Sequence, residues 1–120
     1  MKLLIVDDSN VIRRSIQRTL TDRNAEVRMA GNGLEALRAI EDFEPDMVTM
    51  DITMPEMDGL ACVEEMLRRR PEVRILVVSA LADKATAVEA VKRGAQGFLL
   101  KPFTAETLNE EIAELFEVLG

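Results

Sequence analysis

Four short apolar runs in the sequence each end in a charged or hydroxyl side chain. The polar groups that follow these runs are Asp7 with Asp8, then Asp51, Ser79 and Lys101. Nearly continuous apolar runs of this length are typical of parallel strands that are covered on both faces. The carboxyl ends of parallel strands lie at one edge of an open sheet, where such sheets bind ligands. The pattern therefore predicts that these side chains meet at one edge.

Longer stretches with helical periodicity separate the apolar runs, so strands and helices are expected to alternate. The expected strands are residues 2–7, 25–29, 46–51, 73–79 and 96–100, and the expected helices are residues 9–21, 33–42, 59–70, 83–93 and 104–119. The second strand is the most polar, which places it at an edge of the sheet. Five βα units predict an α/β fold, a doubly wound five-stranded parallel sheet with helices on both faces.

Several local signals predict where these helices begin and end and which residues they bury. Ser9 is suited to cap the first helix, Thr104 with Thr107 to start the last, and Gly94 to end the fourth. The apolar periodicity predicts that the third helix buries Leu60, Val63 and Leu67, and that the last buries Leu108, Ile112, Leu115 and Leu119.

Length and composition narrow the class of protein. The 120 residues fit one domain, and we expect a single unit over 1–120 with no output domain. The net charge is −7 and no long basic stretch is present, which argues against nucleic-acid binding. No apolar run approaches the roughly 20 residues that span a bilayer, and no signal peptide is recognisable. The single cysteine, Cys62, is expected to pack as a small apolar residue in a cytoplasmic protein.

The chain contains no histidine. This excludes histidine-based acid–base catalysis, a Ser-His-Asp triad and histidine-ligated zinc. Any phosphohistidine that reacts with this chain must therefore belong to a partner protein.

The chemistry of the strand-end residues points to a phosphoryl group and a divalent cation. Adjacent carboxylates such as Asp7 and Asp8 repel each other, and a hard cation such as Mg²⁺ relieves that repulsion. Asp51 at a strand end can act as a nucleophile toward phosphorus. Ser79 can donate to a phosphoryl oxygen, and Lys101 can supply a positive charge. Each residue also has a plainer interpretation: a helix or turn cap for the aspartates and the serine, and a surface cation for Lys101.

The complete set resembles the receiver domain of two-component response regulators. It comprises Asp7-Asp8, Asp51, Ser79 and Lys101-Pro102, together with the segment 54–59 (Met-Pro-Glu-Met-Asp-Gly) after Asp51. The resemblance covers the whole chain, and the segments 98–108 and 115–120 are similar to the CheY-like branch. It implies the flavodoxin-like strand order 2-1-3-4-5. The Lys101-Pro102 bond is a candidate for the cis form.

The resemblance implies a role for each residue that occupies a position of the family's motif. It implies that Asp51 accepts a phosphoryl group from a histidine kinase and that Asp7, Asp8, Asp51 and the Thr53 carbonyl hold Mg²⁺. It further implies that Ser79 and Phe98 form a switch, that Lys101 is the family's lysine, and that Thr53 and Leu81 tune hydrolysis. Because Leu81 cannot orient a water molecule, we expect slow self-dephosphorylation. The last helix carries several glutamates where CheY-like chains are expected to carry lysines, which puts flagellar-motor binding in doubt.

The function this resemblance implies is a stand-alone switch, not an enzyme, that promotes its own phosphorylation and dephosphorylation. The fourth helix, fifth strand and fifth helix would then control a partner of the chemotaxis type, and a phosphatase is a further partner that the resemblance implies. Two alternatives remain open. A haloacid-dehalogenase-like phosphatase also uses a strand-end aspartate, but Thr53 stands where its second aspartate belongs. A degenerate receiver would bind partners without phosphorylation.

Overall fold

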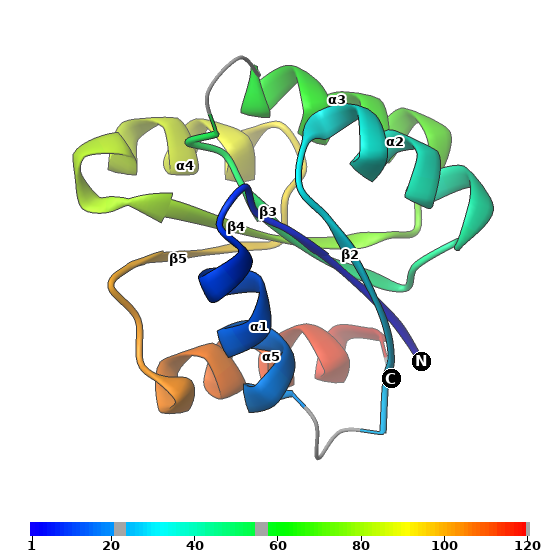
Figure 1. Ribbon diagram of the computed structural model, residues 1–120. Coiled ribbons are helices and arrows are strands. Elements are labelled where there is room, and N and C mark those ends of the chain that lie inside the picture. Colours follow the sequence, from blue (N-terminus) through cyan, green and yellow to red (C-terminus); the bar gives the residue numbers. More distant parts are fainter. Residues whose placement is uncertain (21–23, 55–57, 120) are drawn as a thin grey trace.

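The computed structural model describes residues 1–20, 24–54 and 58–119, and its description of side chains leaves out Leu81 and residues 116–119. The central part of the segment 54–59, the side chain of Leu81 and the predicted burial of Leu119 therefore lie outside the described residues. In the described residues, five strands and five α-helices alternate along the chain (Figure 1). The elements are β1 (Lys2–Val6), α1 (Asn10–Thr19), β2 (Glu26–Ala30), α2 (Gly33–Asp42), β3 (Met47–Asp51), α3 (Gly59–Arg69), β4 (Arg74–Ala80), α4 (Lys84–Lys92), β5 (Gly97–Lys101) and α5 (Ala105–Leu119).

The strands form one parallel sheet in the order β2-β1-β3-β4-β5, as predicted, with β2 at an edge. Helices α2, α3 and α4 cover one face of the sheet, and α1 and α5 cover the other (Figure 1). A short 3-10 turn at Leu81–Asp83 precedes α4, so this helix begins one residue later than expected.

Two hydrophobic clusters fill the two sides of the sheet. Successive strand residues point to opposite faces, so Leu4 and Val6 pack in the cluster under α2, α3 and α4, while Leu3 and Ile5 pack in the cluster under α1 and α5. Because both faces of the sheet are covered by helices, both sets of strand side chains are buried, and the central strands are nearly continuous apolar runs in the sequence.

The predicted caps at Ser9, at Thr104 with Thr107, and at Gly94 are confirmed. The Ser9 hydroxyl accepts a hydrogen bond from the Ile12 N–H at 3.2 Å. Thr104 and Thr107 bond each other's backbone N–H groups with their hydroxyls, at 3.1 and 3.0 Å. Gly94 follows α4 with a φ of 123°, a conformation that suits glycine.

The buried face of α3 differs from the one predicted. Val63 is fully buried, but Leu60 and Leu67 are only partly buried. Cys62 and Met66 take their place in the core. Helix α3 contacts both α2 and α4. These neighbours decide which of its residues are fully enclosed, and those residues differ from the ones that apolar periodicity alone predicts.

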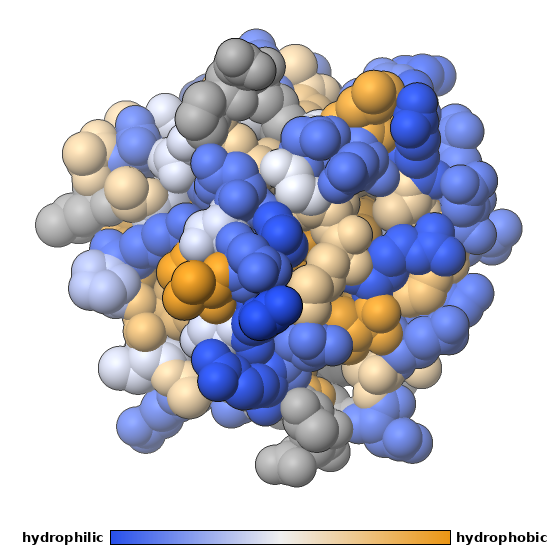
Figure 2. Space-filling model, in the orientation of Figure 1, coloured by the Kyte–Doolittle hydropathy of each residue, from blue (hydrophilic) through white to orange (hydrophobic). Residues whose placement is uncertain are grey.

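The surface is consistent with the acidic composition. The face drawn in Figure 2 is largely hydrophilic, with small hydrophobic areas between the polar side chains. Among the described residues, no helix has the length and apolar character needed to cross a membrane.

Candidate functional site

The predicted site residues lie where four neighbouring strands end. Asp7 directly follows β1, Asp51 is the last residue of β3, and Lys101 is the last residue of β5. Ser79 is the penultimate residue of β4, between β3 and β5. Parallel pairing in register therefore brings these residues to one edge of the sheet, as the sequence predicts.

Lys101 joins the two buried carboxylates of this edge. Its Nζ lies 3.1 Å from Asp7 Oδ2 and 3.4 Å from Asp51 Oδ2. The side chains of Asp7 and Asp51 are only 1% and 2% exposed, while that of Lys101 is 23% exposed. The peptide bond between Lys101 and Pro102 is cis, which confirms the expectation from sequence. The ammonium group thus lies between two carboxylates that water hardly reaches.

Burial and neighbouring charge shift the pKa values of this cluster. Burial is the largest influence on Asp7 and, with the nearby charge of Asp51, raises the pKa of its carboxyl, although the Ser9 N–H and Lys101 act in the opposite direction. Burial alone would lower the pKa of the Lys101 ammonium, but the carboxylates of Asp51 and Asp7 raise it above its usual value. The lysine therefore stays charged, while the ionised form of Asp7 is disfavoured.

The acidic residues at this edge have a geometry suited to a metal ion. One carboxylate oxygen from each of Asp7, Asp8 and Asp51 lies within 4.8 Å of those of the other two. Asp8 is exposed and the other two are buried, so a cation has access from solvent on one side. Hard divalent cations prefer such oxygen ligands, and one bound here would offset the repulsion that raises the pKa of Asp7. The donor set therefore fits a hard divalent cation.

Thr53 contacts Asp51 more directly than the sequence indicates. Its backbone N–H and its hydroxyl both donate to Asp51 Oδ1, at 2.9 and 2.7 Å. The carboxylate is thereby held by Thr53 at one oxygen and faces Lys101 with the other. This contact adds to the carbonyl and tuning roles expected for Thr53 from the sequence. An aspartate whose side chain accepts from the backbone N–H two residues later is a common turn arrangement, so the spacing of Asp51 and Thr53 is a signal for it.

Ser79 and Phe98, the two residues expected to form a switch, lie on β4 and β5. Ser79 is fully buried, and its hydroxyl donates to the Ala80 carbonyl at 3.3 Å. Phe98 is partly buried against the cluster beneath α2, α3 and α4. The hydroxyl therefore bonds the backbone of its own strand in this structure.

Arg13 is a residue at this edge that the sequence analysis missed. Its Nη1 donates to the Asp7 carbonyl at 2.5 Å, and its Nη2 lies 3.4 Å from Asn10 Oδ1. The guanidinium thus ties the first turns of α1 to the backbone of an acidic residue. Nothing in the spacing of the charges marks this contact, because its acceptor is a backbone carbonyl.

Comparison with known proteins places this chain in a family. The family model described as the response regulator receiver domain matches residues 3–113. The chemotaxis protein CheY of Listeria monocytogenes is 41% identical over 113 residues, which cover 93% of this chain and 95% of that protein. CheY of Thermotoga maritima is 39% identical over 112 residues, covering 92% of this chain and 93% of that protein.

Similarity to solved structures agrees with this result. The crystal structure of the receiver domain of NtrX from Brucella abortus has a TM-score of 0.88 and 36% sequence identity, and the match covers 96% of this chain and 98% of that one. Fold, family model and full-length relatives all agree, and the chain belongs to the response regulator receiver domains.

Proposed function

We propose that this chain is a phosphorylation-controlled switch in which Asp51 accepts a phosphoryl group from a phosphohistidine of a histidine kinase. The observation that carries this proposal is the placement of the Lys101 ammonium within 3.4 Å of both Asp7 and Asp51 at the ends of different strands. Phosphoryl transfer requires mainly positioning and neutralisation of charge. This edge supplies a held nucleophile, a fixed cation and further carboxylates for a metal.

In the proposed reaction, a carboxylate oxygen of Asp51 attacks phosphorus and forms a new P–O bond. The P–N bond breaks, its electron pair stays on the departing imidazole, and the product is an acyl phosphate. Thr53 orients the carboxylate through its two bonds to Oδ1, and Lys101 offsets the charge on the phosphoryl oxygens. Mg²⁺, held by Asp7, Asp8, Asp51 and the Thr53 carbonyl, would neutralise further charge on the phosphoryl group. Attack by water on phosphorus would release inorganic phosphate and restore the carboxylate.

The output of the switch is proposed to run through Ser79 and Phe98. The Ser79 hydroxyl makes a bond of 3.3 Å to the Ala80 carbonyl, which is long for an O–H donor and therefore weak. A phosphoryl group on Asp51 would be a stronger acceptor and would favour the conformation in which Ser79 turns toward it. Phe98 would follow, changing the face formed by α4, β5 and α5. Phosphorylation need only favour one existing conformation over the other.

The partners of this switch are proposed from the relatives. Two full-length relatives are named as chemotaxis proteins, so we propose a chemotaxis-type output protein, a histidine kinase as donor and optionally a phosphatase. Helix α5 carries a series of acidic side chains. Because electrostatics guide partner choice, the output protein is expected to offer positive charge to this helix.

Incubation of the protein with acetyl phosphate and Mg²⁺ is expected to add one phosphoryl group, because Thr53 holds one oxygen of Asp51 and the other oxygen faces Lys101. Intact-mass spectrometry measures the adduct. The adduct should be lost in Asp51→Asn and in EDTA, and should persist in the control Asp42→Asn, whose side chain is exposed on α2. An adduct that survives in Asp51→Asn would contradict the proposal. Multiple turnover of phosphate monoesters would instead favour a phosphatase.

The lifetime of the acyl phosphate is expected to depend on position 81. If the Leu81 side chain shields phosphorus from water, Leu81→Ala should speed the decay of the phosphorylated protein by about threefold and Leu81→Glu should not. Loss of the adduct with time, after removal of acetyl phosphate, measures the rate. Unchanged decay in both variants would rule out shielding.

A further inference from the structure

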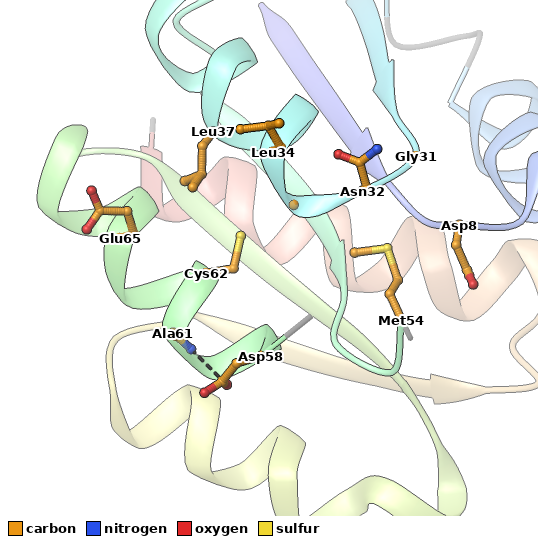
Figure 3. A pocket seen from close by; sticks show the side chains of 11 residues that line it. Asp8, Gly31, Asn32, Leu34, Leu37, Met54, Asp58, Ala61, Cys62 and Glu65 are labelled. Carbon is orange, nitrogen blue, oxygen red and sulfur yellow. Dashed lines mark hydrogen bonds between the residues drawn. The ribbon is translucent and has the colours of Figure 1, made fainter. Parts of the chain in front are cut away.

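A groove of about 770 Å³ lies between α2 and α3 and reaches the sheet edge beside Asp8 (Figure 3). Leu34 and Leu37 of α2 line one side, Cys62 lines the other from α3, and Met54 lies toward the sheet edge. Leu34 is 63% exposed, so this apolar side chain of the groove is open to solvent. Burial raises the pKa of the Cys62 thiol to about 11, so this part of the groove stays uncharged.

The charge on the walls of the groove is negative. Among the described residues that line it are three carboxylates, those of Asp8, Asp58 and Glu65, and no lysine or arginine. Glu65 is bridged by arginines of its own helix, which offset its charge. Asp8 and Asp58 are exposed, and neither takes part in an ion pair of the described residues. At the sheet edge, the floor of the groove is therefore apolar, and the carboxylates of Asp8 and Asp58 make its margin negative.

We propose that this groove docks a helical segment of another protein that has an apolar ridge and lysine or arginine side chains at the end nearest Asp8 and Asp58. The groove between two packed helices accepts the side chains of a third helix, and apolar residues at i, i+4 and i+7 form a matching ridge. The carboxylates of Asp8 and Asp58, which are in no ion pair of the described residues, favour positive charge over negative charge. This surface is separate from the α4, β5 and α5 face, and its occupation needs neither metal nor phosphoryl group.

A pair of helical peptides tests the proposal in EDTA. Each is alanine-based, about 18 residues long so that it is helical in water, and carries leucines at i, i+4 and i+7. One has two lysines at one end and the other has two glutamates there. Fluorescence anisotropy with the full chain is expected to show binding of the lysine peptide and weaker binding of the glutamate peptide.

Variants of the chain locate the binding site. Leu34→Glu removes an apolar side chain that the leucine ridge would contact, and should weaken binding of both peptides, that of the lysine peptide by about tenfold. This change suits the first turn of α2, where an acidic residue is favourable, so the fold is retained. Asp58→Asn keeps a cap on α3, because asparagine also accepts from the Ala61 N–H, and should weaken only the lysine peptide. Val11→Glu on α1, where Val11 is 72% exposed, is the matched control and should leave binding unchanged.

Three results would overturn the proposal. The first is absence of binding, or equal binding of both peptides. The second is an equal loss of binding in Leu34→Glu and Val11→Glu. The third is self-association of the wild type, seen by sedimentation velocity and abolished by Leu34→Glu, which would make a second copy of this chain the occupant. Phosphorylation by acetyl phosphate is measured separately, so failure here leaves the role of Asp51 untouched.

Discussion

Asp7→Asn is expected to raise the free energy of unfolding in EDTA by about 1 kcal/mol and to slow phosphorylation of Asp51 by about 10- to 100-fold. The gain in stability follows from the burial of Asp7 and the nearby charge of Asp51, which together raise the pKa of the Asp7 carboxyl. Asparagine keeps an oxygen that can accept from the Ser9 N–H, as Asp7 Oδ1 does at 2.8 Å, but carries no charge. The loss of phosphorylation follows because the proposed metal site loses one of its carboxylates.

The stability difference has a defined pH dependence. Because the pKa of Asp7 is higher in the folded than in the unfolded chain, the folded state holds a proton that the unfolded state has released. The contribution of Asp7 to stability therefore falls as pH rises from the unfolded toward the folded pKa. The gain in the free energy of unfolding from Asp7→Asn should be absent below the unfolded-state pKa of Asp7 and complete above its folded-state pKa.

Urea unfolding in EDTA at several pH values measures the stability, and intact mass after acetyl phosphate measures the phosphorylation rate. Asp42→Asn, at an exposed position of α2, is the control and should change neither quantity. Mg²⁺ is expected to stabilise the wild type more than Asp7→Asn. A variant that is less stable than the wild type at neutral pH would contradict the electrostatic explanation.

Gly59→Ala is expected to lower the free energy of unfolding by about 2 to 3 kcal/mol. A Cβ at this first residue of α3 would lie 2.7 Å from the Cβ, 2.8 Å from the Cα and 2.9 Å from the carbonyl oxygen of Ile52. These atoms belong largely to the backbone directly after Asp51, so they cannot move aside without shifting the strand end. Alanine has a higher helix propensity than glycine, so the steric conflict must outweigh that gain for the variant to be less stable.

The same substitution should also slow phosphorylation, because the displaced segment carries Asp51 and its partner Thr53. Urea unfolding and the acetyl phosphate reaction measure the two effects. Gly97→Ala is the matched control, since its Cβ would lie 3.6 Å from its nearest neighbours and is expected to be tolerated. Equal stability of Gly59→Ala and the wild type would show that α3 can move away from β3.

The elements of this fold were predictable because their signals are local. The continuous apolar runs and the caps at Ser9, Thr104 and Gly94 located strands and helices to within one or two residues. The polar residues that end the runs also predicted the site, because parallel strands bring their carboxyl ends to one edge whatever the details of packing. The role of Leu81 stays a prediction.

The buried face of α3 was less predictable. Periodicity marks the apolar side of a helix, but its neighbours decide which part of that side is fully enclosed. Leu60 and Leu67 are apolar and correctly spaced, yet contact with α2 and α4 leaves Cys62 and Met66 more deeply buried. A residue's spacing along one helix contains no information on the position of the next helix.

The sequence by itself determined the order of strands and helices, the set of polar side chains that ends the strands and the absence of histidine from these 120 residues, since these depend on residue type and local pattern. The tertiary structure decided which atoms meet: Lys101 with Asp7 across 94 positions, the Thr53 hydroxyl with Asp51, and Arg13 with the Asp7 carbonyl. It also decided that α2 and α3 leave a groove beside Asp8. These features depend on side-chain direction and on the distance between packed helices, which are set only when the whole chain is folded.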